Sequence, residues 1–283
     1  MSAKSAVQFR TSPRTRYKYE RLRTCKSCGA YSTLWEEQCI ACEKPGTYIK
    51  LRDSVKTVSR RMNRSSVLFV ITLCAAAVLF SRTVTELVAS FVVGLAAVIA
   101  LIVLQRRYAE DLVSYRHERL VLGEHQSIRE GLDLDLRFAV KDIKAGRNKE
   151  AYEKLREIGL LIDNNKIRLR KIMCLKHFIL RRDMELELAT LLPDGFDADF
   201  AAYMYEVGKL KPQLINRQVI AYVMKHRAKV EQLPFGRELL LQTASSILLV
   251  KGYLKSFSDF LAPFVPELQR DALLRLCRLL SAD

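Results

Sequence analysis

A long apolar stretch in the first half of the chain most constrains what this sequence can fold into. Residues 67–80, "VLFVITLCAAAVLF", carry no charge, and residues 87–104, "LVASFVVGLAAVIALIVL", contain no Asp, Glu, Lys or Arg. One continuous helix over both segments would be about 57 Å long, roughly twice the hydrocarbon thickness of a bilayer. The sequence therefore predicts two apolar helices joined by a tight turn.

The polar segment "SRTVTE" lies between the two apolar runs. Thr83 and Glu86 form a capping box, which predicts a second transmembrane helix over residues 84–105 that is long enough to span a bilayer. The first transmembrane helix, predicted over residues 65–82, reaches only about 27 Å, so Arg82 would have to extend to the far interface. Two alternatives remain open, namely a hairpin that enters one leaflet and a buried hairpin in a soluble helical protein.

Small side chains recur every four residues in both runs. Thr72 and Ala76 lie in the first, and Ser90 and Gly94 lie in the second. Small residues at this spacing allow two helix backbones to approach closely in lipid. We expect these four residues to line the contact between the two helices.

Positive charges flank the apolar runs on both outer sides. Residues 1–64 carry 15 basic and 5 acidic side chains, and so hold +10 of the chain's net charge of +16. Arginines stand directly before the first run and directly after the second: Arg60, Arg61, Arg64, Arg106 and Arg107. Because positive flanks stay in the cytoplasm, both termini are predicted to be cytoplasmic.

Four of the seven cysteines form two Cys-x-x-Cys pairs, Cys25 with Cys28 and Cys39 with Cys42. Each pair can point two sulfurs at one ion, and the ten residues between the pairs are enough to close a tetrahedron. Four thiolates in this geometry favour Zn²⁺ in a closed structural site, which stabilises a fold without supplying chemistry. A pair of redox dithiols or two disulfides remain the alternatives. A cytoplasmic location fits zinc, because thiolates persist in a reducing compartment.

The residues around these cysteines resemble two known zinc ribbons. The likeness covers about 20 residues and rests on the four cysteines together with Gly29, Ser32 and Trp35. One is the ribbon that precedes the ATPase core of a RecA-like bacterial DNA-repair protein. The other is the rubredoxin-like ribbon of tetratricopeptide proteins that regulate lipopolysaccharide assembly at the bacterial inner membrane. The resemblance implies a zinc ribbon and little else. The predicted location of the protein is the bacterial inner (cell) membrane.

Beyond the apolar runs the chain is predicted to be helical throughout, with breakers such as Pro193 and Pro212 between the helices. Predicted helices include residues 166–181 and 183–192. The fold class is therefore a mainly α membrane protein with a small zinc ribbon and a C-terminal solenoid-like helical domain. The remaining predicted parts are a basic flexible arm (1–20), the zinc ribbon (21–50), a basic linker (51–64), a juxtamembrane helix (106–125) and the cytoplasmic helical domain (126–283).

Residues 144–165, "KAGRNKEAYEKLREIGLLIDNN", resemble the second half of a tetratricopeptide repeat. Gly146 would stand at the turn between two helices, and Asp163 occupies the place of the usual terminal proline. Ala151, Leu155 and Ile158 would face the buried side. The likeness implies stacked antiparallel helix pairs with a concave face for partners. A compact helical domain without a groove is the alternative.

Motifs for catalysis are absent from the sequence. It contains no phosphate-binding loop, no His-Glu-x-x-His and no Gly-x-Ser-x-Gly, so we predict that the protein is not an enzyme. Cys74, Cys174 and Cys277 stand singly among apolar neighbours and are interpreted as small core residues.

The predicted function is that of a membrane-anchored cytoplasmic adaptor or scaffold, which recruits protein partners as a subunit of a larger membrane complex. A homo-oligomer is compatible with this prediction, whereas a pore would require polar residues within the spans. The alternative is a membrane tether for nucleic acid, since zinc ribbons and mixed basic and aromatic arms bind nucleic acid in other proteins. Under either function, lipid or nucleic acid would meet basic residues of the N-terminal quarter: Arg10, Arg14, Arg16, Lys18, Arg21, Arg23, Arg60, Arg61 and Arg64.

Overall fold

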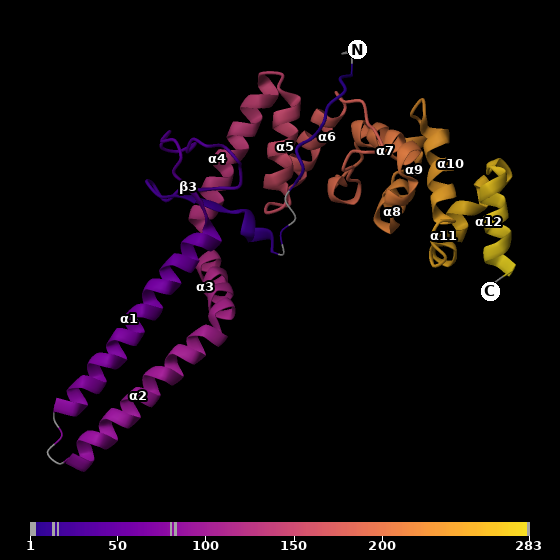
Figure 1. The fold of residues 1–283 in the computed structure, drawn as a ribbon. Coiled ribbons are helices and arrows are strands. Elements are labelled where there is room, and N and C mark those ends of the chain that lie inside the picture. Colours follow the sequence, from indigo (N-terminus) through magenta and orange to yellow (C-terminus); the bar gives the residue numbers. More distant parts are fainter. Residues whose placement is uncertain (1–3, 13–14, 16, 80, 82–83, 282–283) are drawn as a thin grey trace. The chain divides into compact units, whose positions relative to one another are not determined.

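A computed structural model describes residues 4–12, 15, 17–79, 81 and 84–281 of the chain (Figure 1). The protein is mostly helical and has a small sheet near the N-terminus, as the sequence predicted. It divides into two compact units. One, the ribbon unit, comprises Arg14–Asp135, and the other, the helical unit, combines Met1–Pro13 with Leu136–Asp283. The N-terminal arm therefore belongs to the same unit as the C-terminal helices.

The ribbon unit begins with a short 3-10 helix, Lys18–Arg21, and a three-stranded antiparallel sheet. The strands are β1 (Arg23–Cys25), β2 (Tyr31–Ser32) and β3 (Tyr48–Lys50), in the order β2-β1-β3. Cys25 is the last residue of the central strand and pairs with Tyr48. The register therefore places the first cysteine at the end of the sheet, where the loops converge.

Helix α1 (Leu51–Leu79) starts directly after β3, where the sequence predicted a linker over residues 51–64. The Leu51 N–H donates a hydrogen bond of 2.9 Å to the Leu22 carbonyl, and Leu22, Leu51 and Val55 are buried together at the base of the sheet. Residues 51–64 contain no Pro or Gly, so nothing in the sequence interrupts the helix. The ribbon is thus continuous with the helix that carries the first apolar run.

Helix α2 (Val84–Arg107) runs antiparallel to α1 and packs against it, as Figure 1 shows. The Gln105 side chain lies 3.5 Å from the carbonyl oxygen of Asn63, and a Cβ on Gly94 would lie 3.0 Å from Sγ of Cys74. Gly94 is buried in this contact, as expected. The expectation for Thr72 and Ala76 is wrong, because both are exposed and Cys74 faces α2 instead.

Helix α3 (Ala109–Gly123) follows a bend at Tyr108 and packs on the first part of α1, where the Arg116 guanidinium donates a hydrogen bond to the Ser59 hydroxyl. Helix α4 (His125–Lys144) comes next, and the boundary between the two units falls within it, after Asp135. The predicted juxtamembrane helix therefore corresponds to α3.

The helical unit consists of short helices, in which α6 packs between α5 and α7, and α10 packs on α7, α8, α9 and α11. Asn164, Asp197 and Asn216 cap three of them by accepting hydrogen bonds from backbone N–H groups of the first turn. The helices are α5 (Asn148–Gly159), α6 (Asn165–Leu175), α7 (Ala198–Leu210), α8 (Arg217–Lys225), α9 (Arg227–Glu231), α10 (Gly236–Ile247), α11 (Tyr253–Leu261) and α12 (Arg270–Ser281), with 3-10 turns at Ala189–Leu191, Pro212–Leu214 and Ala262–Glu267.

Residues 144–165, which resemble part of a tetratricopeptide repeat in sequence, include the turn between α4 and α5 and the whole of α5. Gly146 adopts φ +75° in the turn between α4 and α5, a backbone conformation that glycine takes without strain. Ala151, Leu155 and Ile158 are fully buried. These positions fit a helix pair, while a repeating array of such pairs stays a prediction.

The helix predicted over residues 183–192 is wrong. Helix α6 ends at Leu175, and the chain then runs in turns and extended backbone up to the 3-10 turn at Ala189–Leu191. Met184, Leu186 and Leu188 are buried, whereas Glu185 between them is exposed. This alternation has the period of two that is typical of extended chain, and it prevails over the helix propensity of Leu and Glu.

Candidate metal centre

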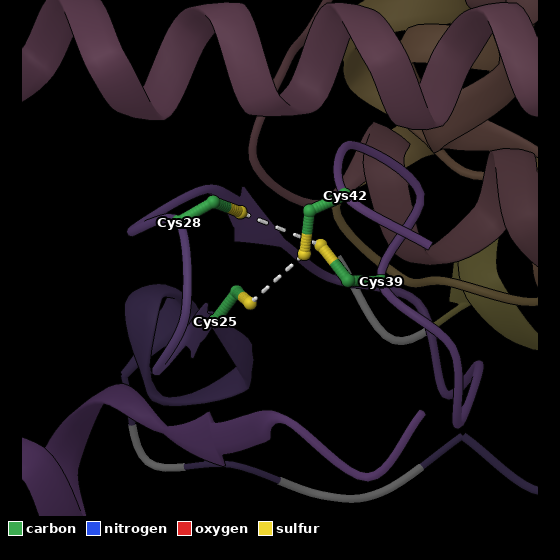
Figure 2. Close-up of side chains that lie close together, drawn as sticks. All are labelled: Cys25, Cys28, Cys39 and Cys42. Carbon is green, nitrogen blue, oxygen red and sulfur yellow. Dashed lines mark hydrogen bonds between the residues drawn. The ribbon is translucent and has the colours of Figure 1, made fainter. Parts of the chain in front are cut away.

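The four predicted ligands lie together at the end of the sheet (Figure 2). The sulfurs of Cys25, Cys28, Cys39 and Cys42 all lie within 4.8 Å of one another. Sγ of Cys25 is 3.8 Å from Sγ of Cys42, and Sγ of Cys28 is 3.7 Å from Sγ of Cys39. Four sulfurs bonded to one zinc ion at about 2.3 Å would be about 3.8 Å apart. The cluster could therefore hold a metal ion, and its dimensions fit zinc.

Both cysteine pairs lie in the same kind of turn. The residue after the second cysteine adopts the left-handed backbone conformation in each, with φ +74° at Gly29 and φ +59° at Glu43. Its N–H donates back to the carbonyl of the first cysteine, at 2.9 Å to Cys25 and 2.8 Å to Cys39. This tight turn aims both sulfurs of a pair at one point.

Electrostatics within the cluster favour thiolates at some positions and oppose them at others. Burial raises the pKa of Cys25, but its hydrogen bond with the Thr47 hydroxyl and hydrogen bonds from the N–H groups of Cys28 and Ser27 lower it to about 6. A hydrogen bond from Ala30 lowers the pKa of Cys28, but burial and the neighbouring sulfurs raise it to about 12. Four sulfurs this close hold their last protons tightly, so complete deprotonation needs a bound cation.

Helix α4 holds the other side of the ribbon in place. The buried carboxylate of Asp135 accepts hydrogen bonds from the Ser32 hydroxyl at 2.8 Å and from the Thr33 N–H at 2.8 Å. Gly131 lies one turn earlier, where a Cβ would come within 2.2 Å of the Tyr31 carbonyl oxygen. Sequence reasoning missed these residues, although the missing side chain of Gly131 in the middle of a helix was a usable signal.

A further contact supports this arrangement from the end of α3. The Tyr31 hydroxyl donates a hydrogen bond of 2.7 Å to the carboxylate of Glu124. Burial and this carboxylate raise the pKa of Tyr31 well above its ordinary value, so the hydroxyl remains a donor. Both residues of β2 are therefore held by side-chain hydrogen bonds, Tyr31 to Glu124 at the end of α3 and Ser32 to Asp135 in α4.

Below the ribbon, the apolar side chains of α1 and α2 point outward. Among the residues that the structure describes, one helix, Thr85–Arg107, is long and apolar enough to span a membrane, and only 6% of its most apolar 18-residue stretch is buried. Phe69, Phe91 and Val93 are each more than 60% exposed. Contiguous exposed apolar surface of this kind is typical of a site that contacts lipid or another protein.

The basic residues predicted to meet lipid or nucleic acid are distributed over both units. Arg60, Arg61 and Arg64 are exposed on α1 just before the apolar run. Arg10 lies in the arm of the helical unit, while Arg14 and Arg16 are outside the described residues. The others lie in the ribbon unit: Lys18, Arg21 and Arg23. The structure therefore does not bring all these residues together in one unit.

No protein-family model, no curated protein and no solved structure matches this chain.

Proposed function

We propose that the protein is a membrane-anchored scaffold of the cytoplasmic face. In this proposal, α1 and α2 both cross the bilayer as a hairpin, and both chain ends lie on the cytoplasmic side. Cys25, Cys28, Cys39 and Cys42 bind a structural zinc ion that keeps the ribbon folded at the base of the hairpin. The ribbon and the helical unit hold protein partners close to the membrane, as parts of a larger complex.

The observation that carries the proposal is the exposed apolar surface shared by two antiparallel helices. Leu68, Phe69 and Leu73 on α1 are exposed to the same degree as Phe91 and Val92 on α2. If only α2 crossed the bilayer, the apolar side chains of α1 would be left in water although α1 packs along α2. A paired hairpin places both sets in lipid and returns the chain to its starting side.

The connection between the ribbon and the hairpin supports a scaffold rather than a flexible tether. Because α1 continues from β3 without a break, the ribbon has a fixed place relative to the helix. The hydrogen bonds from Ser32 and Thr33 to Asp135 fix it from a second side. A partner bound to the ribbon would therefore have a defined position near the headgroups, where anchoring also raises its effective concentration.

The proposal is tested by fractionation followed by gentle purification. The protein should stay in the membrane after alkaline extraction, contain one zinc ion per chain and carry stoichiometric protein partners in mild detergent. The Cys28→Ser variant should lose zinc, and any partner that depends on the ribbon, while it remains in the membrane. A protein that is released by alkali, or that purifies without partners from every source membrane, contradicts the proposal.

The same preparation distinguishes the scaffold from a nucleic-acid tether. Full-length protein in nanodiscs with neutral lipid should bind single-stranded DNA or RNA in a salt-dependent manner if it is a tether. The scaffold proposal expects no such binding above that of a chain with Arg60, Arg61 and Arg64 replaced by Gln.

A further inference from the structure

The N-terminal arm lies extended along the helical unit. The Ser5 N–H donates to the His177 carbonyl at 2.9 Å, and the Ile179 N–H donates to the Ser5 carbonyl at 2.9 Å. These two bonds form a parallel β-bridge between Ser5 and Phe178. The arm thereby adds an extended chain to the segment that follows α6, which is a common way for proteins to bind peptides.

An aromatic side chain anchors the arm. The ring of Phe9 lies 4.7 Å from the ring of Tyr152 on α5 and 5.5 Å from the ring of Phe178, measured between centroids. Tyr152 and Phe178 are themselves almost completely buried. Val7 and Phe9 are half-buried, while Gln8 between them is exposed, so alternate side chains of the arm face the unit as in a bound strand.

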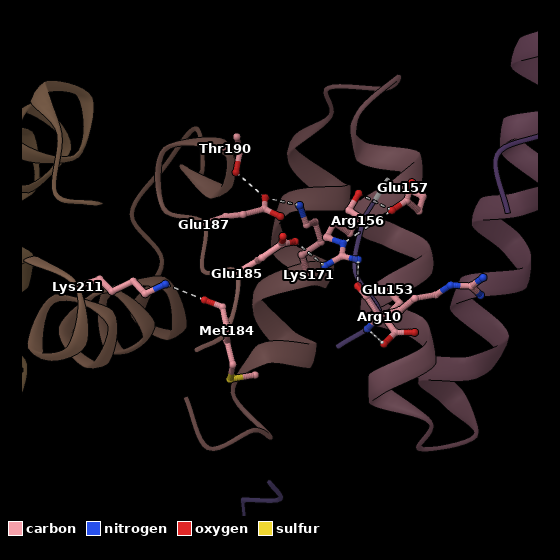
Figure 3. Close-up of polar contacts among 11 residues, drawn as sticks. Arg10, Glu153, Arg156, Glu157, Lys171, Met184, Glu185, Glu187, Thr190 and Lys211 are labelled. Carbon is pink, nitrogen blue, oxygen red and sulfur yellow. Dashed lines mark hydrogen bonds and ion pairs between the residues drawn. The ribbon is translucent and has the colours of Figure 1, made fainter. Parts of the chain in front are cut away.

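Charged side chains of α5 clamp the backbone of the arm, as Figure 3 shows. The carboxylate of Glu153 accepts a hydrogen bond of 2.8 Å from the Arg10 N–H, and the Arg156 guanidinium donates to the carbonyl of the same residue. One helical turn thus satisfies both backbone groups of Arg10. Because Glu153 and Arg156 bind only the backbone groups of Arg10, any residue except proline can occupy position 10.

A third contact extends the clamp by one more position on the same face of α5. The Ser12 hydroxyl donates a hydrogen bond of 2.9 Å to the carboxylate of Glu157. Glu153, Arg156 and Glu157 are only 5–6% exposed, although charged groups on a helix face normally remain in water. The arm is what covers this face.

The covered face retains unused bonding capacity. Within the described residues, Nε and Nη1 of Arg156 make no hydrogen bond; a carboxylate oxygen of Glu157 lies 3.9 Å from Nε, and one of Glu185 lies 3.9 Å from Nη1. The carboxylate of Glu187 already accepts hydrogen bonds from both Lys171 and Thr190. The arm therefore leaves a buried guanidinium partly unsatisfied, which makes it an imperfect occupant.

We propose that this face of α5, together with residues 177–179, is a binding site for an extended peptide with an aromatic anchor, and that the chain's own residues 4–12 occupy it as an exchangeable ligand. The external occupant is an extended segment of a partner protein that has an aromatic side chain at the Phe9 position. Any residue other than proline follows it, and an acceptor group beyond the clamp reaches Arg156. This inference deepens the proposed scaffold, because it names the surface of the helical unit that receives a partner.

The proposal is tested by peptide binding to the full-length chain in detergent, with fluorescence anisotropy of a labelled peptide of residues 4–12. Arg10→Pro in the chain removes the N–H that Glu153 binds, so it weakens the arm without altering the helical unit. In the wild-type chain, the added peptide competes with the chain's own residues 4–12, whose effective concentration at the site is on the order of millimolar. We expect the Arg10→Pro chain to bind the wild-type peptide at least about tenfold more tightly than the wild-type chain does.

Two controls identify the site. The peptide carrying Phe9→Ala should lose binding at least about tenfold, and the Arg10→Pro chain that also carries Glu153→Gln should bind the wild-type peptide more weakly than Arg10→Pro alone. A folded Arg10→Pro chain that binds no better than wild type overturns the proposal. The proposal is also overturned if the helical unit fails to fold both in the Arg10→Pro chain and in a chain that carries Phe9→Ala, because the arm would then be part of the core. Binding is measured without a bilayer, so failure of membrane insertion would leave this result unaffected.

Discussion

The carboxylate of Asp135 accepts a hydrogen bond of 2.8 Å from the backbone N–H of Thr33, although 102 residues separate the two in the sequence. Thr33 follows the short strand β2 in the ribbon, and Asp135 lies in the middle of α4. The same carboxylate also binds the hydroxyl groups of Ser32 and Thr33. One buried charged group thereby fixes the loop between the two cysteine pairs to a helix.

Replacing this group should loosen the ribbon. Asp135→Asn keeps the shape of the side chain but removes an acceptor oxygen and the charge, and we expect a loss of about 2 kcal/mol in stability of the ribbon unit. Hydrogen exchange at residues 31–34 should accelerate. Asp133→Asn is the matched control, since Asp133 is exposed two residues away and should change neither quantity. Equal effects of the two variants would show that the buried hydrogen bonds do not hold the ribbon.

Gly29 and Glu43 occupy the same position in the two cysteine turns, but substitutions of these residues should affect zinc affinity differently. Gly29→Ala places a side chain in the left-handed conformation with no steric contact nearby, so the cost is conformational and about 1 kcal/mol. Glu43→Gly releases the same conformational strain and should not weaken the site. Competition with a chromophoric chelator measures the zinc affinity of each variant. The turns would not control the site if Gly29→Ala and Glu43→Gly reduced affinity alike.

Acid should destabilise the helical unit through two carboxylates. Burial raises the pKa of Asp142 and Glu187, but Lys154 and Arg147 lower the former and Lys171 and Thr190 lower the latter, with a net decrease for both. A folded-state pKa below the unfolded value gives stability that is complete above about pH 4 and is lost as pH falls through the folded pKa.

Denaturant unfolding between pH 7 and pH 3 measures this dependence. Lys154→Met removes the hydrogen bond of 2.9 Å to Asp142, so it should cost about 3 kcal/mol at pH 7 and reduce the slope of stability against pH. An unchanged slope in Lys154→Met would mean that this ion pair does not set the acid sensitivity.

The hairpin predicts a specific cross-link within the apolar region. A Cβ on Gly94 would lie 3.1 Å from Cβ of Cys74, so Gly94→Cys should form a disulfide with Cys74 under mild oxidation. A protease site engineered into the loop at Ser81 would then give two fragments that separate only after reduction. Val93→Cys is the control, because Val93 is 68% exposed and faces away from α1. Equal cross-linking from both positions would contradict the packing of α1 on α2.

Local patterns in the sequence predicted the cluster of four cysteines and the helices that carry the apolar runs, because each depends on residues close together in the chain. The Cys-x-x-Cys turns need only their own backbone, and Gly146 needs only its own turn. The contact between Asp135 and Thr33 depends on chain folding over 102 residues, which no local pattern reports.

Two other differences have physical causes that the sequence did show. In Met184–Leu188 the apolar residues alternate, and burial on one side outweighed helix propensity. In the arm, the positive charge suggested a flexible segment, whereas Phe9 and the backbone groups of Arg10 determine where residues 4–12 lie. The positive charge of the arm therefore did not predict its local contacts, which depend on the aromatic ring of Phe9 and on the backbone groups of Arg10.

The most direct test of the membrane-anchored scaffold is thiol labelling in intact cells with a membrane-impermeant maleimide, in which each introduced cysteine is scored as the labelling above that of the same chain without it. Ser81→Cys reports on the loop, Asp53→Cys on the start of α1, and the native, exposed Cys277 on the C-terminal end, with Cys277→Ser as the background for the first two. The hairpin predicts that Ser81→Cys is labelled from outside, and that Asp53→Cys and Cys277 are labelled only after permeabilisation. Labelling of Asp53→Cys or Cys277 in intact cells would contradict the account.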